Sequence, residues 1–157
     1  MGGGKSIIFE YLMKTRTRVA AIVLRDNGLL CVLHEKKGRR YYLLPGGGVE
    51  PGETDEVALK REMLEETGLA VRPGTLLFET ETIAPDNSRA IVQKAYRCEA
   101  KGVLRPSQDP RVIAAEFIGR ERLSDLVFYP NIKTIIGEAW DKNFLVQPVK
   151  LRIPWED

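Results

Sequence analysis

The sequence has few of the residues that would indicate a disulfide-stabilised, zinc-binding or membrane protein. It contains only two cysteines, Cys31 and Cys98, which lie far apart and not in a CxxC pair. Two free thiols in a reducing compartment are the favoured interpretation, with a disulfide or a metal role as the alternative. No apolar run approaches the ~20 residues that cross a bilayer, and no signal-peptide pattern occurs at the N-terminus. We therefore expect a cytoplasmic protein without a membrane partner.

An excess of charge of one sign is also missing. The 24 basic and 22 acidic residues leave a formal net charge of +2, so no nucleic-acid partner is expected. The hydrophobic fraction of 43% and the charged fraction of 29% are ordinary for a globular chain. The 157 residues fit one domain, which we place at 17–157 after a flexible or partly ordered segment at 1–16.

Apolar and β-branched residues predict strands on both sides of a central helix. Runs at 17–25 and 29–33 flank Asp26-Asn27-Gly28, which is typical of a tight hairpin because Asn and Gly tolerate positive φ. We predict further strands at 41–44, 76–83, 89–98 and 112–118, a loop at 35–40, and helices at 120–126 and 131–140. This order predicts an α+β domain, with a mixed β-sheet flanked by helices in an α/β/α sandwich.

A glycine-rich loop precedes the central helix. Residues 45–48, with the sequence PGGG, are predicted to break regular structure. The helix is predicted over 54–67, because Thr54 can cap its N-terminus and Gly68 can end it in a left-handed conformation. The loop and the helix are therefore expected to form one compact unit.

One face of this helix carries three acids. Glu62, Glu65 and Glu66 project within an arc of about 100°, whereas Val57 and Leu64 point the other way and are expected to pack on the sheet. Taken alone, three such acids most often form a solvated face. Beside a loop whose backbone a ligand can approach closely, they also suit a hard divalent cation, which prefers carboxylate, water and phosphate oxygens.

The residues around the helix form a spaced motif. Gly47 is followed by Glu53, by Arg61-Glu62-Met63, by Glu65-Glu66 and by Gly68-Leu69. Together with the preceding Leu44-Pro45-Gly46, this pattern resembles the signature of the Nudix hydrolase family at every position. The resemblance covers residues 44–69 and implies the family's mixed-sheet α/β/α sandwich.

The resemblance also implies a metal site. The cofactor is expected to be Mg²⁺, with Mn²⁺ as a substitute. The implied ligands are the carboxylates of Glu62, Glu65 and Glu66 and the carbonyl oxygen of Gly46. Glu53 and Arg61 are implied as supporting catalytic residues, with Arg61 orienting nearby carboxylates through charge-assisted hydrogen bonds.

The implied reaction is attack of water on a phosphorus atom of a pyrophosphate bond, which needs a general base. Glu65 is the first choice within the motif. Asp109 lies in a downstream loop comparable to one that supplies the base in some family members, and Glu99 and Glu116 are its rivals. Each of these three downstream acids is also readily explained as a solvated surface residue.

The implied substrate is a small-molecule nucleotide. Pro85 lies sixteen residues after Leu69, a spacing similar to that of the ADP-ribose pyrophosphatase branch, so ADP-ribose or a related ADP-sugar is the leading expectation. Turn chemistry alone also explains Pro85. The alternatives are hydrolysis of oxidised nucleoside triphosphates and a non-catalytic nucleotide-binding module. A homodimer is implied by that branch, although only about 16 residues precede the first predicted strand.

Several other side chains are candidates for substrate contacts. Base stacking could use an aromatic residue, although such residues are more often simply core: Tyr41, Tyr42, Phe78, Phe128 and Tyr129. Contacts to phosphate or ribose could use Arg39, Arg40 or Arg89, for which a solvated loop is the stronger interpretation. The single histidine, His34, is expected to have a structural or surface role.

Overall fold

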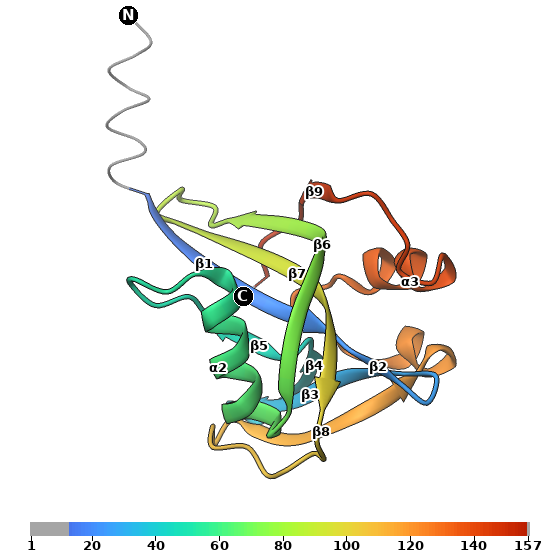
Figure 1. The fold of residues 1–157 in the computed structure, drawn as a ribbon. Coiled ribbons are helices and arrows are strands. Elements are labelled where there is room, and N and C mark those ends of the chain that lie inside the picture. The colour runs from blue at the N-terminus through green and yellow to red at the C-terminus, as the bar shows by residue number, and fades with distance from the viewer. Residues whose placement is uncertain (1–12, 157) are drawn as a thin grey trace, which may run out of the picture.

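The structure, a computed structural model, describes residues 13–156 and divides its strands between two sheets (Figure 1). The first sheet has the order β5-β1-β7-β6-β9. Its strands are β1 Lys14–Ile22, β5 Gly46–Gly48, β6 Ala70–Ile83, β7 Arg89–Lys101 and β9 Val149–Arg152. The pairs β1·β7 and β6·β9 are parallel, whereas β1·β5 and β6·β7 are antiparallel, so this sheet is mixed.

The second sheet is antiparallel and is built around β3. Its strands are β2 Leu24–Arg25, β3 Gly28–Lys36, β4 Arg39–Leu43 and β8 Val112–Gly119. The expected α+β class is confirmed, but the strands form two sheets rather than one. The division arises directly after β1: β1 pairs with β7 in the first sheet, whereas β2, which follows it, pairs with β3 in the second.

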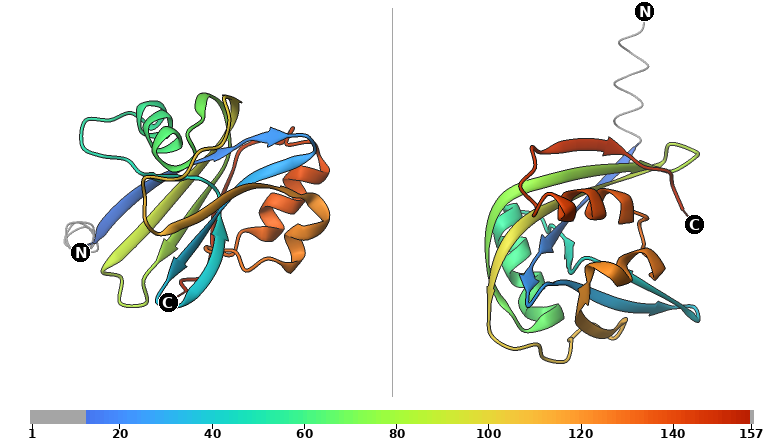
Figure 2. Two further views of the ribbon diagram at one scale, coloured as in Figure 1. Left: turned by 90° about the horizontal axis from the view of Figure 1, so that it is seen from below. Right: turned by 90° about the vertical axis from the view of Figure 1, so that its right-hand side faces the viewer.

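Helices cover both faces of the first sheet (Figure 2). On one face lies α2, Asp55–Thr67, whose buried Leu59 and Met63 pack with Val19 of β1. On the other face lie α3, Lys133–Asp141, the 3₁₀ helix η1, Arg120–Asp125, and the second sheet. The larger core fills this second space, with Phe78 among its largest side chains.

The predicted packing face of α2 is wrong. Val57 and Leu64 are 51% and 54% exposed, whereas Leu59, Met63 and Glu66 are buried. At 3.6 residues per turn, the buried three lie roughly opposite Val57 and Leu64. The acidic arc and the core-facing arc of the helix therefore overlap at Glu66.

Two expectations about the strands also need correction. Residues 45–48 were expected to break regular structure, but Gly46–Gly48 forms a strand that pairs antiparallel with β1. Strand pairing uses backbone N–H and C=O groups, which glycine has like other residues. Strand β6 starts at Ala70 rather than at residue 76 and runs through Pro73, where the register shifts as in a bulge. Strand β9 was not predicted.

The predicted hairpin after β2 is confirmed. Its turn is formed by Asp26 and Asn27, whose φ angles of 51° and 62° suit a tight turn, and Gly28 already belongs to β3. The loop predicted at 35–40 is shorter than expected, since β3 extends to Lys36 and β4 starts at Arg39.

The structure also bears on the expectations about the cysteines, membrane-spanning helices and the N-terminal segment. Cys31 and Cys98 are free and buried, and burial raises the pKa of each thiol to about 12. No helix within residues 13–156 is long and apolar enough to span a bilayer. The segment predicted at 1–16 lies mostly outside the described residues, and β1 already begins at Lys14.

Candidate active site

Helix α2 has the predicted caps. The Thr54 hydroxyl accepts a hydrogen bond from the Val57 N–H at 3.2 Å, and Gly68 ends the helix with a φ of 77°. The Gly68 N–H donates to the Leu64 carbonyl at 3.1 Å. These local contacts fix where the helix begins and ends, and hence where its acids lie.

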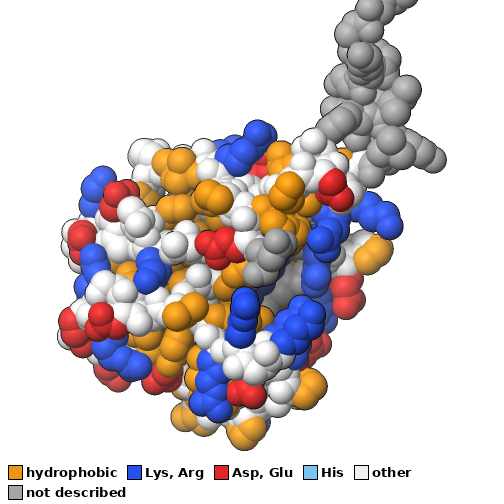
Figure 3. All heavy atoms as spheres, turned by 180° about the vertical axis from the view of Figure 1, so that it is seen from behind, with side chains coloured by type: hydrophobic (Ala, Val, Ile, Leu, Met, Phe, Trp, Pro, Cys, Tyr) orange, Lys and Arg blue, Asp and Glu red, His pale blue; other side chains and the backbone are white. Residues whose placement is uncertain are grey.

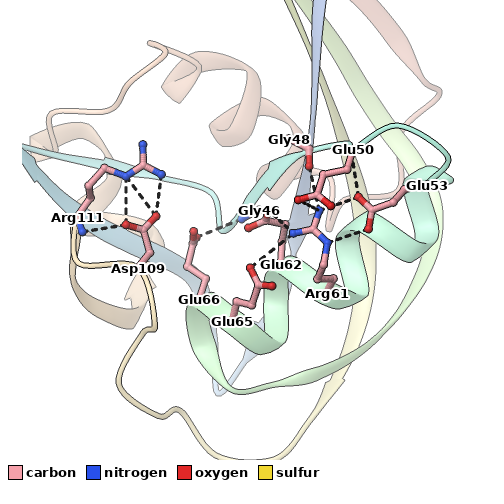
Figure 4. A network of polar contacts seen from close by, with 10 residues as sticks. All are labelled: Gly46, Gly48, Glu50, Glu53, Arg61, Glu62, Glu65, Glu66, Asp109 and Arg111. Atoms are coloured by element: carbon pink, nitrogen blue, oxygen red, sulfur yellow. Dashed lines mark hydrogen bonds and ion pairs between the residues drawn. The ribbon is translucent and has the colours of Figure 1, made fainter.

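Glu66 is the most enclosed acid of the motif, and Glu62, one helical turn before it, is half-buried (Figure 4). Glu66 is 4% exposed, and one of its carboxylate oxygens accepts a hydrogen bond from the Gly46 N–H at 3.2 Å. Burial raises the pKa of Glu66 to about 7, against the nearby positive charge of Arg18, and burial also raises the pKa of Glu62. Two carboxylates whose ionisation is opposed by burial form a site that favours a cation.

The glycine loop fits closely against these acids. A Cβ atom at Gly47 would lie 2.2 Å from Cδ of Glu62, and one at Gly46 would lie 1.9 Å from the carbonyl oxygen of Val19. Gly46 also has a φ of 153°, a backbone angle that residues with a side chain rarely adopt. Only glycine therefore fits at position 46, and glycine at position 47 leaves room for the Glu62 carboxylate against the backbone.

Arg61 joins the helix to the loop that precedes it. Its guanidinium donates two hydrogen bonds to Glu53, at 2.8 and 2.7 Å, in a fork-to-fork arrangement. It also donates to Glu62 at 2.9 Å and to the Gly48 carbonyl at 3.2 Å, and lies 3.5 Å from a carboxylate oxygen of Glu65. The hydrogen bonds from Arg61 lower the pKa of Glu53 to about 2. Arg61 thus contacts three acids of the motif, as an orienting residue would, and Glu53 is part of the same network.

The loop between β7 and β8 brings Asp109 to the same site. The Gln108 N–H donates to the carbonyl oxygen of Glu65 at 2.9 Å, which ties the loop to α2. Arg111 donates to both carboxylate oxygens of Asp109, and these hydrogen bonds lower the pKa of Asp109. Asp109 borders an acidic hollow together with Glu62, Glu65 and Glu66.

The rival acids lie elsewhere. Glu99 pairs with Arg72 on the exposed surface of β6 and β7. Glu116 accepts a hydrogen bond from the Tyr42 hydroxyl at 2.7 Å. Neither borders the acidic hollow or the cleft beside it, so among the downstream candidates the structure brings only Asp109 to the glutamates.

A cleft of about 260 Å³ continues from the carboxylates between the two sheets. Its floor consists of two cross-strand rows of the first sheet, in which directly paired residues face the same side. The rows are Gly48, Arg18, Gln93 and Thr80, and Arg16, Ile91 and Thr82. The opposite wall includes His34 and Tyr41 from the second sheet. On the face shown in Figure 3, Lys and Arg side chains gather around a hollow in the surface.

Some of the predicted substrate contacts lie in this cleft and others do not. Tyr41 and Tyr129 line it, with ring centroids 5.7 Å apart. Phe78 and Phe128 belong to the core, and Tyr42 packs against it. The three predicted arginines, Arg39, Arg40 and Arg89, do not line the cleft. Arg40 instead pairs with Glu35, and Arg89 lies over the ring of Trp155.

Sequence reasoning missed several residues that line the cleft: Arg16, Arg18, Gln93, Arg111 and Trp155. The alternation of β1 carried a signal for two of them, because Arg16 and Arg18 share a strand face with the buried Ala20 and Ile22. His34 was expected in a structural or surface role. It is in fact buried at the edge of the cleft, and burial lowers its pKa to about 4, so its ring is neutral at pH 7.

The residues present fit a divalent cation whose coordination shell is completed by water and a bound substrate. Among residues 13–156, no three acidic, histidine or cysteine side chains lie close enough to hold a metal ion by themselves. Mg²⁺ usually takes one or two carboxylates and completes its coordination with water and substrate phosphates. The pair formed by the buried Glu66 and the half-buried Glu62, against which the glycine backbone packs, has this chemistry.

The structure thus defines an α+β domain with a carboxylate-rich cleft beside a glycine loop and a capped helix. Residues 14–136 match the family model of the NUDIX domain. The chain belongs to the Nudix family, as its motif predicted.

Two relatives and one solved structure illustrate the match. A MutT-like protein of Streptomyces ambofaciens is 32% identical over 97 residues, covering 61% of this chain and 60% of the relative. The nucleoside triphosphatase NudI of Enterobacter is 47% identical over 60 residues, covering 36% and 42%. The chain thus matches less than two thirds of either relative's length. The crystal structure of an ADP-ribose pyrophosphatase from Streptococcus suis has a TM-score of 0.67 at 15% identity, covering 88% and 98%, and supports the fold alone.

Proposed function

We propose that this protein hydrolyses a pyrophosphate bond of a nucleotide with the help of Mg²⁺, or of Mn²⁺ as a substitute. The observation that carries the proposal is the convergence of Glu62, Glu66 and Asp109 at the end of a cleft whose floor holds Arg16 and Arg18. An anionic chain of phosphates can thus lie between a cation held by the acids and the guanidinium groups, with the rest of the substrate in the cleft.

The residues of the chain have distinct tasks in this reaction. Glu62 and Glu66 would hold the divalent cation, with Glu65 and the Gly46 carbonyl as the further predicted ligands. When bound, the cation would neutralise phosphate charge and lower the pKa of a coordinated water molecule. Arg61 donates a hydrogen bond to Glu62 and so keeps it in position.

Asp109 is our choice for the general base. It borders both the cleft and the acidic hollow, whereas Glu65 borders only the hollow. The hydrogen bonds from Arg111 lower the pKa of Asp109, which keeps it ionised but makes it a weaker base, so its position and not its pKa supports this choice. Glu65, with a side chain 44% exposed, is the alternative.

For the substrate we favour nucleoside triphosphates, which include the oxidised triphosphates considered from the sequence. One of the curated relatives described above, from Enterobacter, is named a nucleoside triphosphatase. ADP-ribose is the second candidate, supported by the position of Pro85. Pro85 lies in the turn between β6 and β7 and does not line the cleft, which weakens that support. The homodimer and the cytoplasmic location stay predictions.

Product analysis over a nucleotide panel tests the proposal. The purified protein with Mg²⁺ is incubated with nucleoside triphosphates, ADP-ribose and ADP-sugars, and the products are separated by ion-exchange chromatography. We expect a nucleoside monophosphate and pyrophosphate from a triphosphate, whereas ADP-ribose hydrolysis would yield AMP and ribose phosphate. Absence of turnover on the whole panel, with nucleotide binding retained, would establish a binding module instead and overturn the proposal.

A further inference from the structure

The floor of the cleft contains a buried amide whose nitrogen lacks a partner. Gln93 is 3% exposed and lies at the centre of the first sheet, on β7. Among the described residues, its Nε2 atom has no hydrogen-bond acceptor. A buried donor without a partner is costly and rare in native structures, and because Gln93 lines the cleft, an acceptor from a bound ligand can pair with it.

Arg18 fixes the orientation of this amide. Nη1 of Arg18 donates to Oε1 of Gln93 at 2.6 Å, and Nη2 donates to the carbonyl oxygen of Leu44 at 2.8 Å. A guanidinium has donors only, so a flipped amide would place two N–H groups against a cation. The oxygen of Gln93 must therefore face Arg18, and the N–H groups remain for the cleft.

The position of Gln93 suits the base end of a nucleotide. It lies in the same cross-strand row as Gly48, with β1 between them, which corresponds to about 10 Å at the usual strand spacing. Gly48 and its neighbours border the carboxylate end, where the phosphates are expected. A nucleoside that extends along the row would bring its base to Gln93.

Arg16 belongs to the phosphate end of the cleft. Its guanidinium lies against Gly48, with Nη2 3.1 Å from the position of a Cβ atom there. The hydroxyl groups of Thr80 and Thr82, which also line the cleft, can donate or accept. The two rows of the floor contain no carboxylate that could pair with the N–H groups of Gln93.

We propose that the Gln93 amide nitrogen donates a hydrogen bond to a ring carbonyl oxygen of the substrate's base, so that the site prefers an oxo base to its amino counterpart. The inference rests on the proposed function, since it assumes a nucleotide in the cleft. Guanine presents N7 and O6 side by side as acceptors, whereas adenine presents an amino donor beside N7. An amino group directed at Gln93 would leave both donors unpaired.

Two pairs of nucleotides test this with little change of shape. ITP and ATP differ at position 6 of the purine, and UTP and CTP differ at position 4 of the pyrimidine, each as oxo against amino. We expect the wild-type kcat/KM to favour the oxo member of at least one pair by about tenfold or more, the size expected for one buried hydrogen bond. Preference for the amino member in both pairs, or none in either, would refute the inference.

The variant Gln93→Glu isolates the donor. It keeps the length of the side chain and an oxygen for Arg18, but replaces the N–H groups with an acceptor. The oxo preference should fall at least about tenfold, mainly through a higher KM for the oxo substrate. Gln147→Glu, at an exposed position after α3, is the matched control and should leave the ratio unchanged. If Gln93 only supported Arg18, Gln93→Glu would alter both members of a pair equally, and the inference would fail.

A binding measurement separates this inference from the proposed function. Calorimetric titration with IMP and AMP, or with UMP and CMP, needs no turnover. A protein that hydrolyses nothing but binds the oxo nucleotide more tightly, with the difference lost in Gln93→Glu, would refute the proposed reaction and keep the inference. An active enzyme whose oxo-to-amino ratio is unmoved by the variant would do the reverse.

Discussion

The close approach between Gly47 and Glu62 leads to a specific prediction for Gly47→Ala. The added Cβ would lie 2.2 Å from Cδ of Glu62, whereas ordinary contacts begin at 3.4 Å, so the carboxylate must move by 3.4 − 2.2 = 1.2 Å. Its new position has to break or lengthen the 2.9 Å hydrogen bond from Arg61. The main chain is expected to stay in place, because β5 remains paired with β1.

The two consequences differ in size. A displacement of about 1 Å at a reacting centre can lower turnover by about 100-fold, so we expect a loss of that order. The stability cost is that of an unfavourable side-chain conformation, about 0.5–1.5 kcal/mol. For a domain of this size, this lowers the melting temperature by only a few degrees, at about 2–4 °C per kcal/mol.

Gly38→Ala is the matched control. Gly38 has a φ of 76°, so alanine there is also strained, but nothing lies within 4 Å of its Cβ position and it lines no part of the cleft. Steady-state turnover and thermal unfolding of both variants should show similar melting temperatures but a large loss of activity only in Gly47→Ala. Wild-type turnover in Gly47→Ala would refute the argument that this glycine keeps Glu62 in position.

Three further predictions concern single side chains. Glu66→Gln should lower Mg²⁺-dependent turnover in steady-state assays by at least about 100-fold. The control Glu56→Gln, on the exposed face of α2, should leave turnover unchanged. Equal activities of the two variants would remove Glu66 from the proposed metal site. Asp109→Asn should lower kcat by about 10²–10⁴-fold with little change in Mg²⁺ affinity, whereas Glu116→Gln should leave kcat near wild type; the reverse order would exchange their roles. His34 has a lowered pKa of about 4, against 6.5 in the unfolded chain, so the unfolded state binds the proton more readily between these values. The free energy of unfolding of the wild type, measured by urea unfolding and compared with that of His34→Gln, should therefore be highest above pH 6.5. It should fall relative to the variant by up to about 3 kcal/mol as the pH is lowered towards 4. A difference between the two proteins that stays constant with pH would contradict this.

The local part of the site was predictable from the sequence. The caps at Thr54 and Gly68 and the positions of Glu62, Glu65 and Glu66 on one arc depend on helix geometry alone, which repeats every 3.6 residues. The family motif was likewise legible, because it lies within one continuous stretch. The packing of α2 was not, since Leu59 and Met63 could be recognised as its buried residues only once the sheet beneath them was known.

The cleft was decided by tertiary structure. Arg18 and Gln93 are 75 residues apart, and they meet because β1 and β7 pair in parallel in one register. A shift of that register by one residue would turn either side chain to the opposite face. Asp109 reaches the glutamates because its loop is tied to the end of α2, and Trp155 reaches the cleft after β9, a strand that no pattern indicated. The sequence could thus specify the acidic helix, whose geometry is local, but the cleft depends on long-range strand pairing.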